Sequence, residues 1–157
     1  AAGSTAAPSM RVAVSNNFAD ARRSWAGTPT AVCAAVDVRV TSVSGTTRYS
    51  VVKLRNSAGA SVARIEVNRN RQLFVRADVQ GTRFTVGAQL PFGSWQELTL
   101  CASNGTSGTM RLLLGGTQIG SWTANLGTQP ITQIQLGDNE RRTATANWDD
   151  VVVTAGA

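Results

Sequence analysis

The chain has no histidine, one tyrosine and a single lysine, and these scarcities exclude several kinds of site. Two cysteines without histidine cannot supply the four ligands of a structural zinc ion. No apolar run approaches the roughly 20 residues that a membrane-spanning helix needs. The first residues also lack the charged start and apolar centre of a signal peptide. We therefore expect residues 1–10 to be a linker or mature N-terminus, in a piece of a longer or processed protein.

The net charge of +6 rests almost entirely on arginine, because Lys53 is the only lysine. Basic grooves for nucleic acid usually cluster their cations among aromatic residues. Here the arginines are scattered singly, apart from the doublets Arg22-Arg23 and Arg141-Arg142. Codon usage in a GC-rich genome explains such a bias, and so does a preference for acidic polysaccharide. We do not expect a nucleic-acid partner.

Threonine, valine, serine and glycine dominate the chain, a composition typical of strands and turns. Turn signals recur every 8–12 residues or so, and no segment keeps a helical apolar period. The pattern predicts an all-β fold, a two-sheet antiparallel β-sandwich in one domain over 11–157. The predicted strands are 11–14, 31–41, 48–56, 61–68, 71–78, 82–86, 95–102, 109–114, 117–123, 131–136 and 143–154.

Cys33 and Cys101 each lie in a predicted strand, on the face opposite its valines or leucines. If the two strands are neighbours, this parity suits a cross-strand disulfide. We favour a disulfide over two free thiols, which would indicate an oxidising compartment.

Two motifs near the C-terminus carry a family resemblance. An apolar strand ends in Gly137-Asp138-Asn139, and Trp148-Asp149-Asp150 opens a final valine-rich strand. With the tryptophan-led segment 95–100 and the Gly115-Gly116 turn, their order resembles the laminin-G-like jelly rolls of secreted bacterial proteins. The resemblance implies a concanavalin A-like fold and a secreted, non-catalytic, lectin-like module that binds a glycan and packs with other domains. Trp148 departs from it, since the family more often has a smaller apolar residue there.

The same resemblance implies a structural calcium ion where the first and last strands meet. Calcium takes six to eight oxygen ligands from carboxylates, amides and carbonyls. The alternative is that these are solvated residues of an edge strand. The candidate ligands are Asp149, Asp150, Asn16, Asn17 and Asp20.

Alternation within the strands predicts one sheet face that combines an aromatic ring with cations and amides. Sugar sites use such a ring for stacking and such groups for hydroxyls and carboxylates. A solvated outer face is the alternative, and Trp25 and Trp95 either stack on sugar or lie in the core. The candidate ligand-binding residues are Arg39, Tyr49, Lys53, Arg55, Gln133 and Gln135.

Catalysis is not expected from the residues. Asp149 and Asp150 are adjacent on a strand and face opposite ways, so they cannot act on one substrate atom. Asp138 and Glu140 are predicted to lie in a charged turn. Polysaccharide lyases of the resembled fold generally use a histidine or tyrosine base, and Tyr49 is the only candidate. We therefore predict that the domain is not an enzyme. A polysaccharide hydrolase or lyase and a structural or adhesive module without sugar binding are the alternatives.

Overall fold

The computed structural model describes residues 10–156, with their side chains except those of Met10, Arg11, Val12, Val14, Asn16 and Phe18. These residues form an all-β fold without a helix. Every pairing between strands is antiparallel. The strands are β1 (Met10–Ser24), β2 (Ala31–Val43), β3 (Tyr49–Asn56), β4 (Ser61–Val67), β5 (Gln72–Ala77), β6 (Thr82–Gln89), β7 (Gln96–Ser103), β8 (Gly108–Leu114), β9 (Thr117–Ala124) and β10 (Ile131–Ala155).

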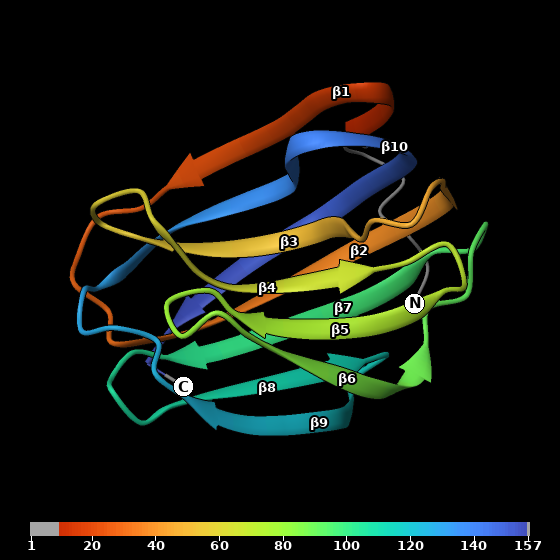
Figure 1. The fold of residues 1–157 in the computed structure, drawn as a ribbon. Helices are drawn as coiled ribbons and strands as arrows, with labels where there is room; N and C mark the ends of the chain where they lie inside the picture. The colour runs from red at the N-terminus through yellow and green to blue at the C-terminus, as the bar shows by residue number, and fades with distance from the viewer. Residues whose placement is uncertain (1–9, 157) are drawn as a thin grey trace.

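Two layers arise because the long strand β10 belongs to both. Its first part, residues 131–136, pairs with β3 and continues through β4, β5 and β6 as the front sheet. Its second part, residues 144–155, pairs with β2 and continues through β7, β8 and β9 as the back sheet. Figure 1 shows β3 to β6 in front of β2 and β7 to β9. The predicted two-sheet jelly roll is confirmed.

Strand β1 follows β10 around its bend. Ala19 to Ser24 pair with Asp138 to Gln133, and Met10 to Val14 pair with Trp148 to Ala144, with register shifts between the two stretches. Sequence patterning predicted a loop between two strands at 137–142 and irregular chain at 20–29. Residues 25–29 are irregular as predicted, but 20–24 belong to β1 and 137–142 belong to β10. Patterning missed these parts because the alternation of apolar residues breaks where the strands bend although the backbone pairing continues.

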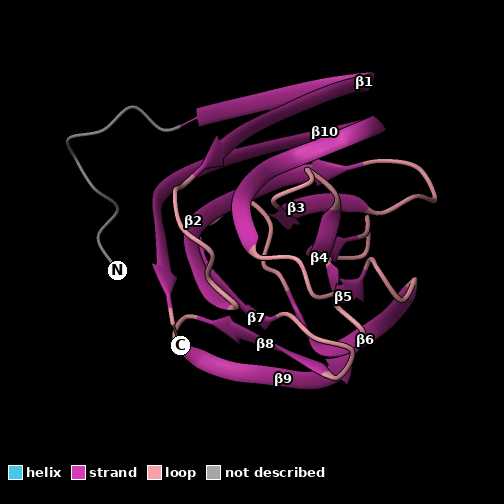
Figure 2. Ribbon diagram, turned by 90° about the vertical axis from the view of Figure 1, so that its left-hand side faces the viewer, coloured by secondary structure: helices cyan, strands magenta, loops and turns pink. Residues whose placement is uncertain are grey.

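Side chains from both layers fill the space between the sheets. Trp148 of the back sheet lies with its ring centroid 6.4 Å from that of Tyr49, and its Nε1 donates to the Val51 carbonyl oxygen at 3.1 Å. At the opposite side of the sandwich Phe84 of β6 stacks on Trp122 of β9, with ring centroids 5.8 Å apart. These contacts nearly close the sheet on itself, with β1 and β10 bridging one side (Figure 2).

The predicted disulfide between Cys33 and Cys101 is confirmed. The two cysteines are direct partners in the register of β2 and β7. The prediction therefore needed only that both cysteines face away from the apolar side of their strands and that the two strands are neighbours. Among the described residues there is no helix long and apolar enough to cross a membrane.

Candidate functional site

Charged and amide side chains gather on the outer face of the front sheet. We call this surface the front face and define it by the residues that share one side of the strands, together with the charged bend of β10. Its members are Arg48, Ser50, Lys53, Arg55, Arg64, Glu66, Phe74, Arg76, Arg83, Gln133, Gln135, Asp138, Asn139, Glu140 and Arg142. Four of the six predicted ligand-binding residues belong to it: Lys53, Arg55, Gln133 and Gln135.

A β-bulge removes Tyr49 from this face. Ser50 pairs with Glu66 and Val52 pairs with Ile65, so Val51 is an extra residue in β3. Strict alternation predicted Tyr49 and Lys53 on one side. Tyr49 therefore lies in the core with 1% of its surface exposed, and no described residue forms a hydrogen bond with its hydroxyl. The prediction that Tyr49 stacks on a sugar is therefore wrong.

Arg39 is also separated from the other predicted ligand residues. It lies on β2 in the back sheet, where its register partner is Asn147 of β10. The Nη2 of Arg39 donates to the Oδ1 of Asn147 at 3.4 Å. Its guanidinium stacks on Trp95, 5.3 Å from the ring centroid. Parity within each strand predicted that these side chains point outward, but it could not tell which sheet each strand joins. The other candidate aromatic, Trp25, packs partly buried against the core.

Lys53 and Asp138 form a buried ion pair at the centre of the front face. Lys53 Nζ lies 3.1 Å from Asp138 Oδ1, and the two side chains are 2% and 1% exposed. The second oxygen of Asp138 accepts the Ser50 backbone N–H at 3.0 Å. Burial lowers the pKa of Lys53, and the negative charge of Asp138 opposes that effect only in part. Asn139 is exposed and its Oδ1 accepts a further hydrogen bond from Lys53.

A second set of ion pairs extends across β4 to β6. Arg64 reaches Asp78 with Nη2 to Oδ1 at 2.6 Å, and Glu66 binds Arg83 of β6. These carboxylates are nearly buried, with side chains 7% and 5% exposed. Sequence reasoning missed Arg64, Glu66 and Arg83. Their shared parity on consecutive strands was the available signal, because like-facing charges on adjacent strands pair across a sheet.

Arg48 and Arg55 form no ion pair with a carboxylate among the described residues. Arg48 stacks on Phe74, 4.4 Å from the ring centroid. Arg55 donates to Gln135 Oε1 at 2.7 Å and to the Gly59 carbonyl oxygen. Burial lowers the pKa of Arg55, yet a guanidinium remains charged at any ordinary pH. The front face therefore carries two cations whose charge no protein carboxylate neutralises at close range.

The predicted calcium ligands do not come together. Asp20 pairs with Gly137 and Asn17 with Arg142, whereas Asp149 lies beyond the far end of β1, next to the residue paired with Met10. The side chain of Asn16 is outside the described residues. Asp149 pairs instead with Asp37. No group of three Asp, Glu or Cys side chains that could hold a metal ion occurs in the described part of the chain. The described side chains among these donors do not form a calcium site, and calcium binding itself stays an untested prediction.

No protein-family model matches the chain, and no curated protein sequence does either. Solved structures do share its fold. A sialidase matches 94% of this chain with a TM-score of 0.75 at 8% identity, and the matched part is only 15% of the sialidase. The cellulose-induced protein Cip1 matches over 94% of this chain and 79% of its own, with a TM-score of 0.71 at 14% identity. An endo-β-1,4-glucuronan lyase from Trichoderma reesei matches over 94% of this chain and 80% of its own, with a TM-score of 0.66 at 12% identity.

These neighbours correct the prediction that the domain is not an enzyme. Besides the glucuronan lyase they include several alginate lyases. The lack of histidine is therefore not a sufficient reason to classify a domain of this fold as non-catalytic. The sequence argument assumed a histidine or tyrosine base, whereas the front face holds a buried lysine whose pKa is lowered. The laminin-G-like resemblance holds at the level of the jelly-roll fold.

Proposed function

We propose that this domain degrades a polysaccharide that contains uronic acids, and that the glycan lies across the front face. The observation that carries the proposal is the line of two arginines without a carboxylate partner, Arg48 just before β3 and Arg55 on it, with the buried Lys53 between them. The occurrence of this fold in lyases named for alginate and glucuronan supports the same substrate class.

The arrangement suits a linear polyanion. Arg48 immediately precedes β3 and Arg55 lies near its end, about 20 Å apart at the rise of an extended strand. Guanidinium groups bind carboxylates with two parallel hydrogen bonds. Gln133 lies beside Arg55 on β10 and offers its amide group to sugar hydroxyls, whereas Gln135 is buried and its Oε1 accepts a hydrogen bond from Arg55. A chain running along β3 would therefore pass over Asn139 and Lys53.

The residues favour elimination over hydrolysis. A glycosidase needs two carboxyl groups that face the scissile bond. Glu66 and Asp138 of the front face, and Asp78 beside it, are each bound by a cation and nearly buried. Glu140 is therefore the one exposed acid among the residues that define this face. Elimination needs a cation at the uronate carboxylate and a base for the proton on C5. That proton leaves to the base, the C4=C5 double bond forms, the C4–O4 bond breaks and O4 takes a proton from water.

Lys53 is the candidate base, because a lowered pKa increases the fraction of neutral amine at a given pH. It lies directly beneath the exposed amide of Asn139. Arg55 or Arg48 would neutralise the carboxylate and acidify the C5 proton. Binding of the substrate would need to displace Asn139 from the amine.

The test measures binding and cleavage separately. Polyuronates and an uncharged β-glucan are incubated with the protein, and the ultraviolet absorbance of the new double bond is recorded alongside calorimetric binding. We expect both signals for a polyuronate and neither for the glucan, with weaker binding at higher salt because exposed charges are screened. Binding without cleavage contradicts the elimination, and the absence of both contradicts the whole proposal.

A further inference from the structure

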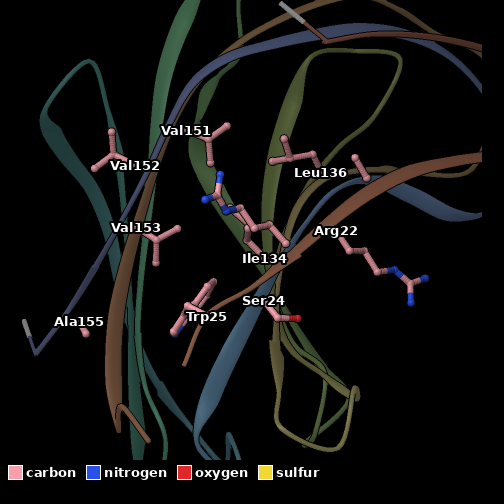
Figure 3. Close-up of a pocket in the computed structure, with 11 residues that line it drawn as sticks. Arg22, Ser24, Trp25, Ile134, Leu136, Val151, Val152, Val153 and Ala155 are labelled. Atoms are coloured by element: carbon pink, nitrogen blue, oxygen red, sulfur yellow. The ribbon is translucent and has the colours of Figure 1, made fainter. Parts of the chain in front are cut away.

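An apolar pocket of about 650 Å³ opens between the sheets, on the side of the front sheet opposite the front face. The two parts of β10 form facing walls, with Ile134 and Leu136 on one and Val151 and Val153 on the other (Figure 3). The end of β1 completes the pocket with Trp25. A volume in this range is typical of sites for small molecules.

Along this part of the pocket, residues 10–156, which the structure describes, supply β10 with a partner on one edge only. Met10 of β1 pairs with Trp148, and the segment of β10 that follows pairs with β2. Val152 is 56% exposed and Val151 is 41% exposed at this edge. Two exposed valines beside an apolar pocket indicate a surface whose free energy falls when apolar atoms cover it.

Two hydrogen-bond donors of the pocket lack an acceptor. Trp25 Nε1 is buried and has no hydrogen-bond partner among the residues that the structure describes. Arg23 also lines the pocket, and its guanidinium takes part in no hydrogen bond or ion pair within the described residues. None of the lining residues is acidic. The buried Trp25 donor costs free energy without an acceptor, which a ligand oxygen placed there recovers. Arg23 is exposed and offers a charged donor to a ligand anion.

From the apolar walls and these two donors, we infer that the pocket binds an amphipathic carboxylate, with its alkyl chain between the two parts of β10 and its carboxylate at Arg23 and Trp25. Guanidinium groups bind carboxylates through paired hydrogen bonds, which an alcohol or an amine cannot match. The site is independent of the proposed glycan cleavage, because Ile134 and Leu136 of the pocket lie on the opposite side of β10 from Gln133 and Gln135 of the front face.

Calorimetry with decanoate tests the inference, with decanol and butyrate as matched probes that lack the charge or the long chain. We expect decanoate to bind most tightly and Arg23→Gln to weaken it about tenfold or more. Trp25→Phe keeps the apolar wall but removes the donor, so it should weaken decanoate by a smaller factor. Binding of decanol should not respond to Arg23→Gln.

Arg22→Gln is the matched control, since Arg22 also lines the pocket but its guanidinium is bound to Asp20 at 2.7 Å. A bulky side chain at the exposed Ala155 should block the pocket, so Ala155→Trp should abolish decanoate binding at an unchanged melting temperature. The inference is overturned if decanoate does not bind, if the two arginine variants bind it equally, or if sedimentation shows a dimer that buries Val152. Cleavage of polyuronate should be the same in Arg23→Gln and the parent protein.

Discussion

Gly137 lies so close to β1 that a Cβ atom there would be 2.5 Å from the Ala19 carbonyl oxygen. Its φ of +84° is also in the region that side chains disfavour. The bend of β10 and the close approach of β1 both depend on this glycine.

Gly137→Ala should therefore destabilise the domain by about 1–3 kcal/mol, through strained backbone and displaced β1. At this chain length that corresponds to a melting temperature lower by roughly 2–4 °C per kcal/mol. Gly87→Ala is the control, because a Cβ there meets nothing within 4 Å. Equal melting temperatures for the two variants would show that the bend does not need glycine.

Tyr49→Phe should leave the stability at neutral pH unchanged or raise it by up to about 1 kcal/mol, since the variant removes a buried hydroxyl without a partner. Burial, with the nearby charge of Asp138, raises the pKa of Tyr49 above its usual value of 10.0. The unfolded chain then loses this proton before the folded protein does. Stability should fall as the pH rises above about 10.

Tyr49→Phe should reduce that alkaline loss, which urea unfolding at a series of pH values would measure. A large loss of stability at neutral pH would instead reveal a hydrogen bond to the hydroxyl.

Asp37→Asn should stabilise the protein at neutral pH. Burial first, and then the charges of Asp150, Glu97 and Asp149, raise the pKa of Asp37. The folded state therefore penalises the ionised carboxylate, and the penalty disappears as the pH falls through the raised pKa. The stabilising effect should be absent in acid.

Asp78→Asn provides the opposite case, because Asp78 is paired with Arg64. This substitution should lower the free energy of unfolding by about 1.5–3 kcal/mol. Thermal melts at neutral and acidic pH compare the two. A destabilised Asp37→Asn variant at neutral pH would contradict the repulsion among these acids.

Reduction of the Cys33–Cys101 disulfide should lower the melting temperature by about 10 °C, from an upper estimate near 4 kcal/mol for a loop of 68 residues. A Cys33→Ala/Cys101→Ala variant should melt at the same temperature as the reduced parent protein, and adding reductant should not change that temperature. If the parent protein melts identically with and without reductant, the disulfide contributes nothing to stability.

Sequence patterns predicted the features that depend on local alternation. The sheet class and the disulfide both followed from which residues share a face. The candidate site needed more, because the bulge at Val51 reverses the side on which Tyr49 lies, and no residue type marks a bulge in advance. Patterning also could not place Arg39 in the other sheet, or show that Lys53 is buried. Those facts depend on which strands pair over long range.

The most direct test of the proposed elimination is the rate of double-bond formation from a polyuronate by Lys53→Arg. Arginine keeps the positive charge beside Asp138 but cannot lose its proton to act as a base. We predict a rate at least about a hundredfold lower with binding and melting temperature retained. The parent protein's rate should rise with pH as Lys53 becomes neutral. Cleavage by Lys53→Arg at the parent rate would contradict the assignment of Lys53 as the base.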